Sequence, residues 1–150
     1  MPFQAMPVRD KRLSDLVVFE GFEPSVGYNR RDINVTPPAA SAPVKLGTIV
    51  FRAKSTDETA AFAVVTAVGD IALTNEYAVV IGDQYGYQTS FVPLAIAAGK
   101  FNAIGYTSGP MKIKDYLPKQ IHSALNATQF AALAQALEKQ GIVVVDHVIV

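Results

Sequence analysis

The distribution of prolines, charges and apolar residues divides this chain of 150 residues near position 43. Residues 1–43 carry charges, prolines and isolated apolar clusters without a lasting period, whereas residues 44–150 are weakly charged and rich in β-branched residues. Proline fixes φ and favours extended geometry in the residue before it. We therefore expect an extended N-terminal arm over 1–43 and one compact domain over 44–150.

Runs of β-branched and aromatic residues predict strands throughout the domain. The alternation of Ile33 with Val35 is a weak signal for an edge strand within the arm. Lys112 and Lys114 favour an edge position for the strand that contains them. Segment 60–68 is too short for its period to exclude a helix. The strands expected in the domain are 45–54, 60–68, 75–83, 91–97, 101–107, 111–117 and 142–150.

One helix is predicted near the C-terminus, where apolar residues follow a helical spacing. Asn126 and Gln129 suit a capping box at its start, and Gly141 supplies the left-handed residue that ends many helices. The predicted fold class is therefore α+β, mainly β, with one C-terminal helix and the extended N-terminal arm. The apolar stripe of the helix consists of Phe130, Leu133, Ala134 and Leu137.

Low charge limits the partners of the chain. Charged residues make up 17 % of the sequence, below the roughly 25 % usual in soluble proteins, and the net charge is zero. A neutral surface is more easily buried against a protein, and it lacks the basic field that nucleic-acid binding needs. No apolar run approaches the roughly 20 residues that span a bilayer. We therefore expect no direct nucleic-acid contact and no membrane insertion.

The sequence contains no recognisable catalytic, cofactor or metal motif. His122 has no acidic neighbour nearby, and His147 follows Asp146 in a predicted strand, where adjacent side chains point to opposite faces. Cysteine is absent, which removes thiol chemistry. The G-x-S-x-G motif and the glycine-rich phosphate motifs are also absent. We expect no catalytic residue, no cofactor and no metal, and we predict that the chain is not an enzyme.

An apolar cluster in the arm is the first candidate for contact with a protein partner. Exposing such a cluster to water costs about 25 cal/mol per Å² of apolar surface. It should therefore dock, either on its own domain or on a neighbouring subunit. The residues that we assign to this contact are Val17, Val18, Phe19 and Phe22.

Two further groups are candidates for partner binding. Arg30 and Arg31 either anchor the arm to acidic groups of a partner or form a solvated pair balanced by Asp32. Tyr85 and Tyr87 lie in a glycine-flanked turn. They either form a binding loop or pack over the rim of the core, because tyrosine offers a large contact area with few rotamers to freeze.

The sequence contains an extended strap over 28–36, an Ala/Pro linker over 37–43, predicted strands over 46–50, 61–65 and 77–81, and a closing segment over 126–150. In these pieces the chain resembles the head decoration, or cement, proteins of tailed bacteriophages. In those proteins an N-terminal arm precedes a small β-rich domain that opens with a glycine followed by β-branched residues.

The resemblance implies a structural role in the virion, on a capsid assembled in the host cytoplasm. Such proteins bind the major capsid protein on the outer surface of an icosahedral shell, as trimers or other homo-oligomers such as dimers, and clamp neighbouring subunits. The competing hypotheses are a minor head or tail protein, a small oligomeric ligand-binding module, and an enzyme of unknown class. A decoration protein without residues 1–40 is expected to stay folded but to lose attachment.

Overall fold

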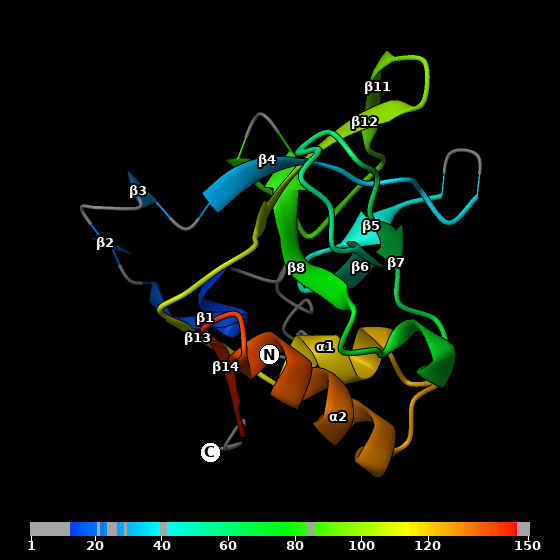
Figure 1. Ribbon diagram of the computed structural model, residues 1–150. Coiled ribbons are helices and arrows are strands. Elements are labelled where there is room, and N and C mark those ends of the chain that lie inside the picture. Colours follow the sequence, from blue (N-terminus) through cyan, green and yellow to red (C-terminus); the bar gives the residue numbers. More distant parts are fainter. Residues whose placement is uncertain are drawn as a thin grey trace, which may run out of the picture.

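The computed structural model describes residues 13–20, 22–23, 27–28, 30–39, 42–83 and 86–146. Figure 1 shows a ring of strands that stands over two helices, with a small second sheet beside the helices. The predicted fold class is confirmed, because the structure is mainly β and carries a C-terminal helix.

Strands that are far apart in the sequence close into the ring. Neighbouring strands are antiparallel in the order β4, β12, β8, β6 and β7. A parallel bridge between Val35 and Phe62 joins the end of β4 to the start of β7 and completes the ring. The ring strands are β4 (Arg30–Asn34), β12 (Lys100–Tyr106), β8 (Asn75–Asp83), β6 (Ile49–Ala53) and β7 (Ala63–Val64). Two short strands extend it, namely β11 (Leu94–Ala97) beside β12 and β9 (Gly86–Tyr87) beside β8.

Strand β8 separates two apolar cores, because successive side chains of a strand point to opposite faces. Ala78 and Val80 belong to the core enclosed by the ring, and Tyr77, Val79 and Ile81 belong to an outer core. When both faces of a strand are covered, all of its side chains are buried and its sequence is a continuous apolar run. This explains the unbroken run of buried residues in β8. Strands β5 (Val44–Lys45) and β10 (Ser90–Phe91) pair with each other and contribute to the enclosed core. The rest of that core is Ile33, Val35, Val44, Val50, Phe62, Phe91 and Ala103.

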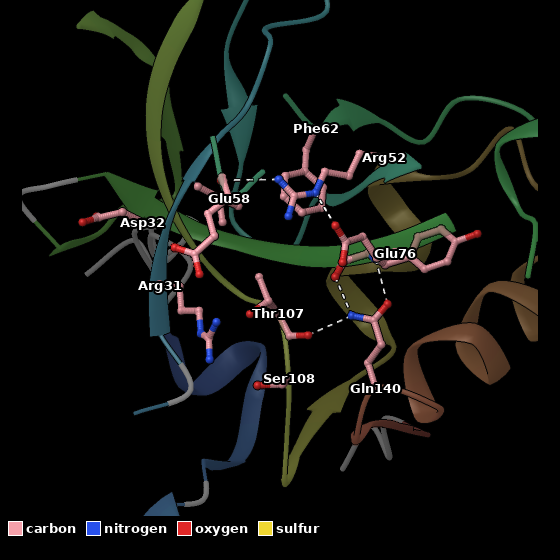
Figure 2. Close-up of a pocket in the computed structure, with 11 residues that line it drawn as sticks. Arg31, Asp32, Arg52, Glu58, Phe62, Glu76, Thr107, Ser108 and Gln140 are labelled. Carbon is pink, nitrogen blue, oxygen red and sulfur yellow. Dashed lines mark hydrogen bonds and ion pairs between the residues drawn. The ribbon is translucent and has the colours of Figure 1, made fainter. Parts of the chain in front are cut away.

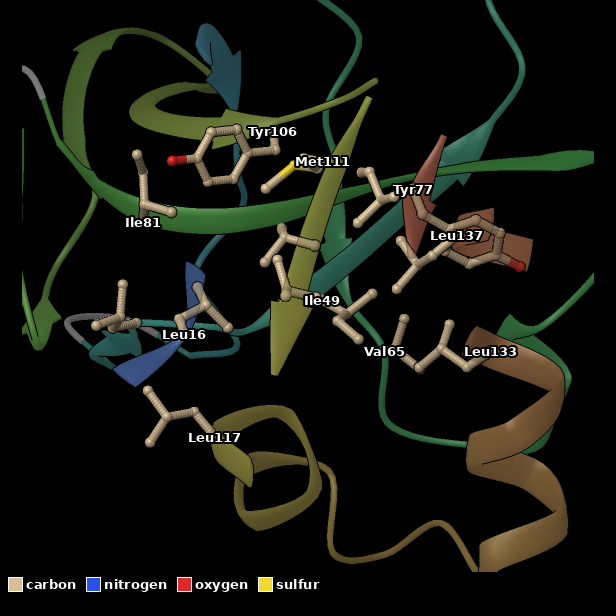
Figure 3. Packing of buried hydrophobic residues seen from close by; sticks show 14 of the residues in the cluster. Leu16, Ile49, Val65, Tyr77, Ile81, Tyr106, Met111, Leu117, Leu133 and Leu137 are labelled. Carbon is tan, nitrogen blue, oxygen red and sulfur yellow. The ribbon is translucent and has the colours of Figure 1, made fainter. Parts of the chain in front are cut away.

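The outer core lies between the ring, the helices and the second sheet (Figure 3). The helices are α1 (Tyr116–Ile121) and α2 (Ala127–Glu138). The second sheet has the order β1 (Val17–Glu20), β13 (Met111–Lys114) and β14 (Ile142–Val145), with β13 and β14 parallel. Residues of the outer core include Leu16, Ile49, Val65, Tyr106, Met111, Ile113, Leu117, Leu133, Leu137 and Ile142.

The smaller elements are the 3₁₀ turns Leu13–Asp15 and Val68–Asp70 and the hairpin of β2 (Phe22–Glu23) with β3 (Gly27–Tyr28).

Parts of the N-terminal stretch are built into the domain. Leu16 is fully buried in the outer core, and the strand that follows it pairs with β13. Ile33 and Val35 are buried in the enclosed core, and β4 pairs along its length with β12. Of the two docking alternatives for the apolar cluster, Val17 adopts the first, because it packs against the outer core of its own domain, whereas Val18 is exposed. Deletion of residues 1–40 would remove the core side chains of Leu16, Ile33 and Val35, so we expect it to destabilise the domain. The expectation that the domain stays folded without residues 1–40 stays a prediction.

The local predictions for α2 and β8 are confirmed. The Asn126 side chain accepts a hydrogen bond from the Gln129 N–H (2.9 Å), and the Gln129 side chain accepts one from the Asn126 N–H (3.0 Å). Gly141 has a φ of +86°, as its predicted role requires. Strand β8 has the predicted bounds.

Several other local predictions are wrong in extent or position. The strand predicted over 111–117 ends at Lys114, helix α1 follows it, and the strand is central because β1 and β14 flank it. The strand predicted over 60–68 is limited to β7. Pro93 divides the one predicted over 91–97 into β10 and β11, because proline cannot donate to a ladder. Residues 147–150 of the last predicted strand lie outside the described residues.

Candidate functional site

The ring brings three of the predicted contact residues together. Arg30 and Arg31 at the start of β4 and Tyr87 on β9 line one shallow hollow of about 170 Å³, which Asp32, Ile81 and Ile104 complete. Strand β4 reaches this place by pairing with β12, and β9 reaches it by folding back on the end of β8. Tyr87 is 47 % exposed, and both arginines are exposed, so all three side chains are accessible.

Gly105 permits the close approach of strands beneath this hollow. It lies opposite Arg31 in the β4–β12 ladder. A Cβ atom added at this position would lie 2.8 Å from the Val79 carbonyl oxygen and 2.9 Å from Cδ1 of Ile33. The ring can therefore close tightly here only around a residue without a side chain.

Arg31 also lines a second hollow, of about 240 Å³ (Figure 2). Arg52 crosses this hollow, forms an ion pair with Glu76 and lies 4.3 Å from the centroid of the Phe62 ring. The same guanidinium donates to the Ala60 carbonyl oxygen (2.8 Å). Arg52 therefore holds the loop before β7 against the ring, and its charge is already compensated.

Gln140 forms another wall of the second hollow (Figure 2). Its side-chain amide bonds to backbone groups that a neighbouring strand would otherwise pair with. Its Oε1 accepts from the Tyr77 N–H (2.8 Å), and its Nε2 donates to the carbonyl oxygens of Tyr77 (2.7 Å) and Thr107 (2.8 Å). These bonds complete the ladder where β8 and the chain after β12 diverge. Gln140 is therefore structural. The Arg31 side chain, in contrast, makes no hydrogen bond or ion pair within the described residues and is available to a partner.

The predicted contact residues on β1 divide between core and surface. Val17 is partly buried against the outer core, and Val18 is 51 % exposed on a strand at the edge of its sheet. Phe19 pairs through its backbone with Lys112, and Phe22 pairs with Tyr28 in the β2–β3 hairpin. The side chains of Phe19 and Phe22, and all of Tyr85, lie outside the described residues.

His122 is a structural residue in this fold. Its Nε2 accepts from the Ile49 N–H (2.9 Å), and its Nδ1 lies 2.9 Å from the Val65 carbonyl oxygen. Burial lowers the pKa of His122 below its ordinary value, and the hydrogen bond to Val65 opposes that shift in pKa. Within the described residues, no three His, Cys, Asp or Glu side chains gather as they would to hold a metal ion. His147 lies outside that part of the chain.

Exposed apolar side chains on β11 were missed from the sequence. The apolar pattern of 91–97 predicts a strand but not its exposure, yet Leu94 is 53 % exposed and Ile96 is 62 % exposed. The signal was present in the sequence, because no charged residue occurs from position 84 to position 99. A charge-free segment is as typical of a contact surface as of a core strand.

Comparisons with protein-family models, curated proteins and solved structures found no match to this chain. Among the described residues, the helices are too short and too polar to cross a membrane.

Proposed function

We propose that this chain is a structural virion protein that binds the outer surface of an icosahedral phage capsid and clamps neighbouring major capsid subunits. The proposal starts from the resemblance of the sequence to head decoration proteins. It needs a rigid domain, a firmly attached N-terminal stretch and accessible contact residues, and it needs no catalytic group.

The observation that carries the proposal is the attachment of the N-terminal stretch. Leu16 is fully buried, and the following strand β1 is held along β13. A partner that binds the residues before Leu16 is therefore mechanically connected to the outer core. Val18 remains exposed on the edge strand, where the backbone of a partner can add to the sheet.

The small volume of the hollows and the residue types that line them favour a protein partner over a small ligand. Pockets for small molecules usually enclose about 300–1,000 Å³, whereas the hollows beside Arg31 measure about 170 and 240 Å³. Arg31 and Tyr87 belong to the residue types that are enriched at protein interfaces. Repetition of such a small contact on a lattice would add avidity through effective concentration.

A ligand-binding module is the second candidate, because Arg30, Arg31 and Tyr87 converge on one hollow. A minor head or tail protein is the third, since it would use the same contact residues at a lower copy number. The three functions differ in where the chain is found and in how many copies are present.

Quantitative mass spectrometry of purified particles tests the proposal. We expect a copy number comparable with that of the major shell protein. A few copies per particle would instead indicate a minor head or tail part. Complete absence from particles would overturn the virion hypothesis and favour the ligand-binding module.

A variant without residues 1–12 tests the role of the attached N-terminal stretch. It keeps Leu16 and the described core residues, so we expect a folded domain with a native circular dichroism spectrum. We expect its binding to shells prepared without this chain to be at least tenfold weaker than that of the full chain. Undiminished binding would show that the N-terminal residues do not act as a clamp.

A further inference from the structure

The hairpin of β11 and β12 lies at the end of the molecule away from the helices (Figure 1), and it carries exposed apolar side chains. All four side chains of β11 are exposed. Leu94 and Ile96 are more than half exposed, and Val92 just before them is 47 % exposed. Scattered single apolar residues on a surface need no explanation, but several on one short segment indicate an interaction site.

The free edge of β11 lacks the usual protection against pairing with another strand. β11 pairs with β12 on one side and with no other strand among the described residues. Natural edge strands are commonly protected by lysine or another charge, yet the sequence carries no charge from position 84 to position 99. The unpaired backbone groups of this edge are therefore available to an added strand.

A local irregularity in the hairpin turns Ile96 outward. The register shifts between Ala95 and Ala97, which leaves Ile96 without a partner residue on β12. Such bulges re-aim the side chain of the extra residue. Ile96 is 62 % exposed as a result, and it lines a hollow of about 140 Å³ together with Phe101 and Asn102.

The turn end of the hairpin is fixed to the ring, so the surface is pre-organised. Nδ2 of Asn34 donates to the carbonyl oxygens of Thr59 (3.0 Å) and Gly99 (3.2 Å), and its Oδ1 accepts from the Phe101 N–H (2.9 Å). Beside this anchor, the buried Oδ1 of Asn102 has no hydrogen-bond partner in the described part of the chain. A rigid apolar surface binds with a smaller loss of conformational entropy than a mobile loop does.

The area and charge of the surface restrict what can bind to it. A stable pair of proteins buries about 800 Å² on each partner, and three half-exposed aliphatic side chains supply only a fraction of that area. The surface alone is therefore too small for a lasting dimer, but it suits one of several contacts on a lattice, where avidity adds to weak binding. The edge strand itself carries no charge, whereas Asp32, Glu58 and Lys100 line the hollow beside Ile96. The edge therefore favours an uncharged apolar segment, since burying an unpaired charge against it would be costly.

We propose that the β11–β12 hairpin receives an extended, uncharged apolar segment of the major shell subunit, which adds as a strand to the free edge of β11. This inference rests on the function proposed above. It gives the domain a contact to the shell that is separate from the N-terminal stretch, because β11 and β1 lie at distant ends of the molecule (Figure 1). A protein held at two such places can bridge neighbouring subunits.

The test measures binding of three full-length proteins to expanded shells of the same phage prepared without this chain. They are the wild type, the double variant Leu94→Ser/Ile96→Ser, and the control Leu73→Ser, which changes a residue 74 % exposed at a different place. We expect the double variant to bind at least tenfold more weakly and the control to bind as the wild type does. We also expect amide hydrogen exchange in β11 to slow when the wild type is bound.

Several results would overturn the inference. Equal binding by the wild type and the double variant, or unchanged exchange in β11 on the shell, would reject the hairpin contact but keep the proposed function. No binding by the wild type would reject both. A wild type that self-associates in solution and becomes monomeric in the double variant would assign the hairpin to a second copy of this chain. Circular dichroism of the three proteins excludes misfolding as the cause.

Discussion

His122 connects three elements of the fold through its two ring nitrogens. The Val65 carbonyl oxygen can only accept and the Ile49 N–H can only donate, so Nδ1 carries the proton and Nε2 is unprotonated. The neutral imidazole fits both bonds, whereas a second proton on Nε2 would face the Ile49 N–H. Burial lowers the pKa of His122 from its ordinary value of 6.5. The unfolded chain therefore binds this proton more readily than the folded protein does.

This arrangement predicts a loss of stability in mild acid. The contribution of His122 is complete above its unfolded pKa of 6.5 and is lost progressively as the pH falls below that value. Thermal unfolding followed from about pH 8 to about pH 5 should show a falling Tm. In His122→Gln the fall in Tm should be smaller than in the wild type. Identical pH dependence in His122→Gln and wild type would contradict this role.

At the scale of elements, local sequence signals predicted the structure where neighbouring residues determine it. Helix α2 has its cap, its apolar stripe and its terminal glycine within one segment, so the prediction was correct. Helix α1 is six residues long and includes Pro118, so it shows no helical period. The central position of β13 depends on β1, which is distant in the sequence, and lysine spacing alone therefore gave the wrong position.

The capping box of α2 yields a prediction for that element. Asn126→Ala removes the acceptor for the Gln129 N–H, and we expect the free energy of unfolding to fall by about 1 kcal/mol. Asn126→Asp keeps an acceptor oxygen and should retain most of the wild-type stability. Urea unfolding of the three proteins measures the difference. A decrease of equal size in both variants would show that the cap hydrogen bond is not the cause.

At the scale of the whole molecule, closure of the ring decides which surface residues meet. Arg30 and Arg31 were candidates from the sequence, as was Tyr87, but their convergence on one hollow depends on the pairing of β4 with β12 and of β8 with β9. Such long-range pairings leave no local signal in the sequence. The exposure of Leu94 is not predicted either, because the sequence of an apolar strand is similar whether the strand lies in a core or on a surface.

The integration of the N-terminal stretch predicts unequal effects at two neighbouring positions. Leu16→Ala opens a cavity in the outer core, and we expect a loss of about 2–5 kcal/mol in the free energy of unfolding. Val18→Ala, at a site 51 % exposed, should change that free energy by no more than about 0.5 kcal/mol. Chemical denaturation measures both. A Leu16→Ala protein as stable as the wild type would mean that this stretch is dispensable for the domain.

The pairing of β1 with β13 also has a consequence for biosynthesis. Val17 pairs with Ile113, and Ile33 on β4 pairs with Ala103. The first strands to be synthesised therefore cannot pair until residues 100–114 have been added to the chain. At about 5–20 residues per second, synthesis from β4 to the end of β13 takes roughly 4–16 s. During this interval β1 and β4 lack the strands with which they pair, and the ring closes only when most of the chain is complete. The growing chain is therefore expected to depend on chaperones until β12 and β13 have been synthesised.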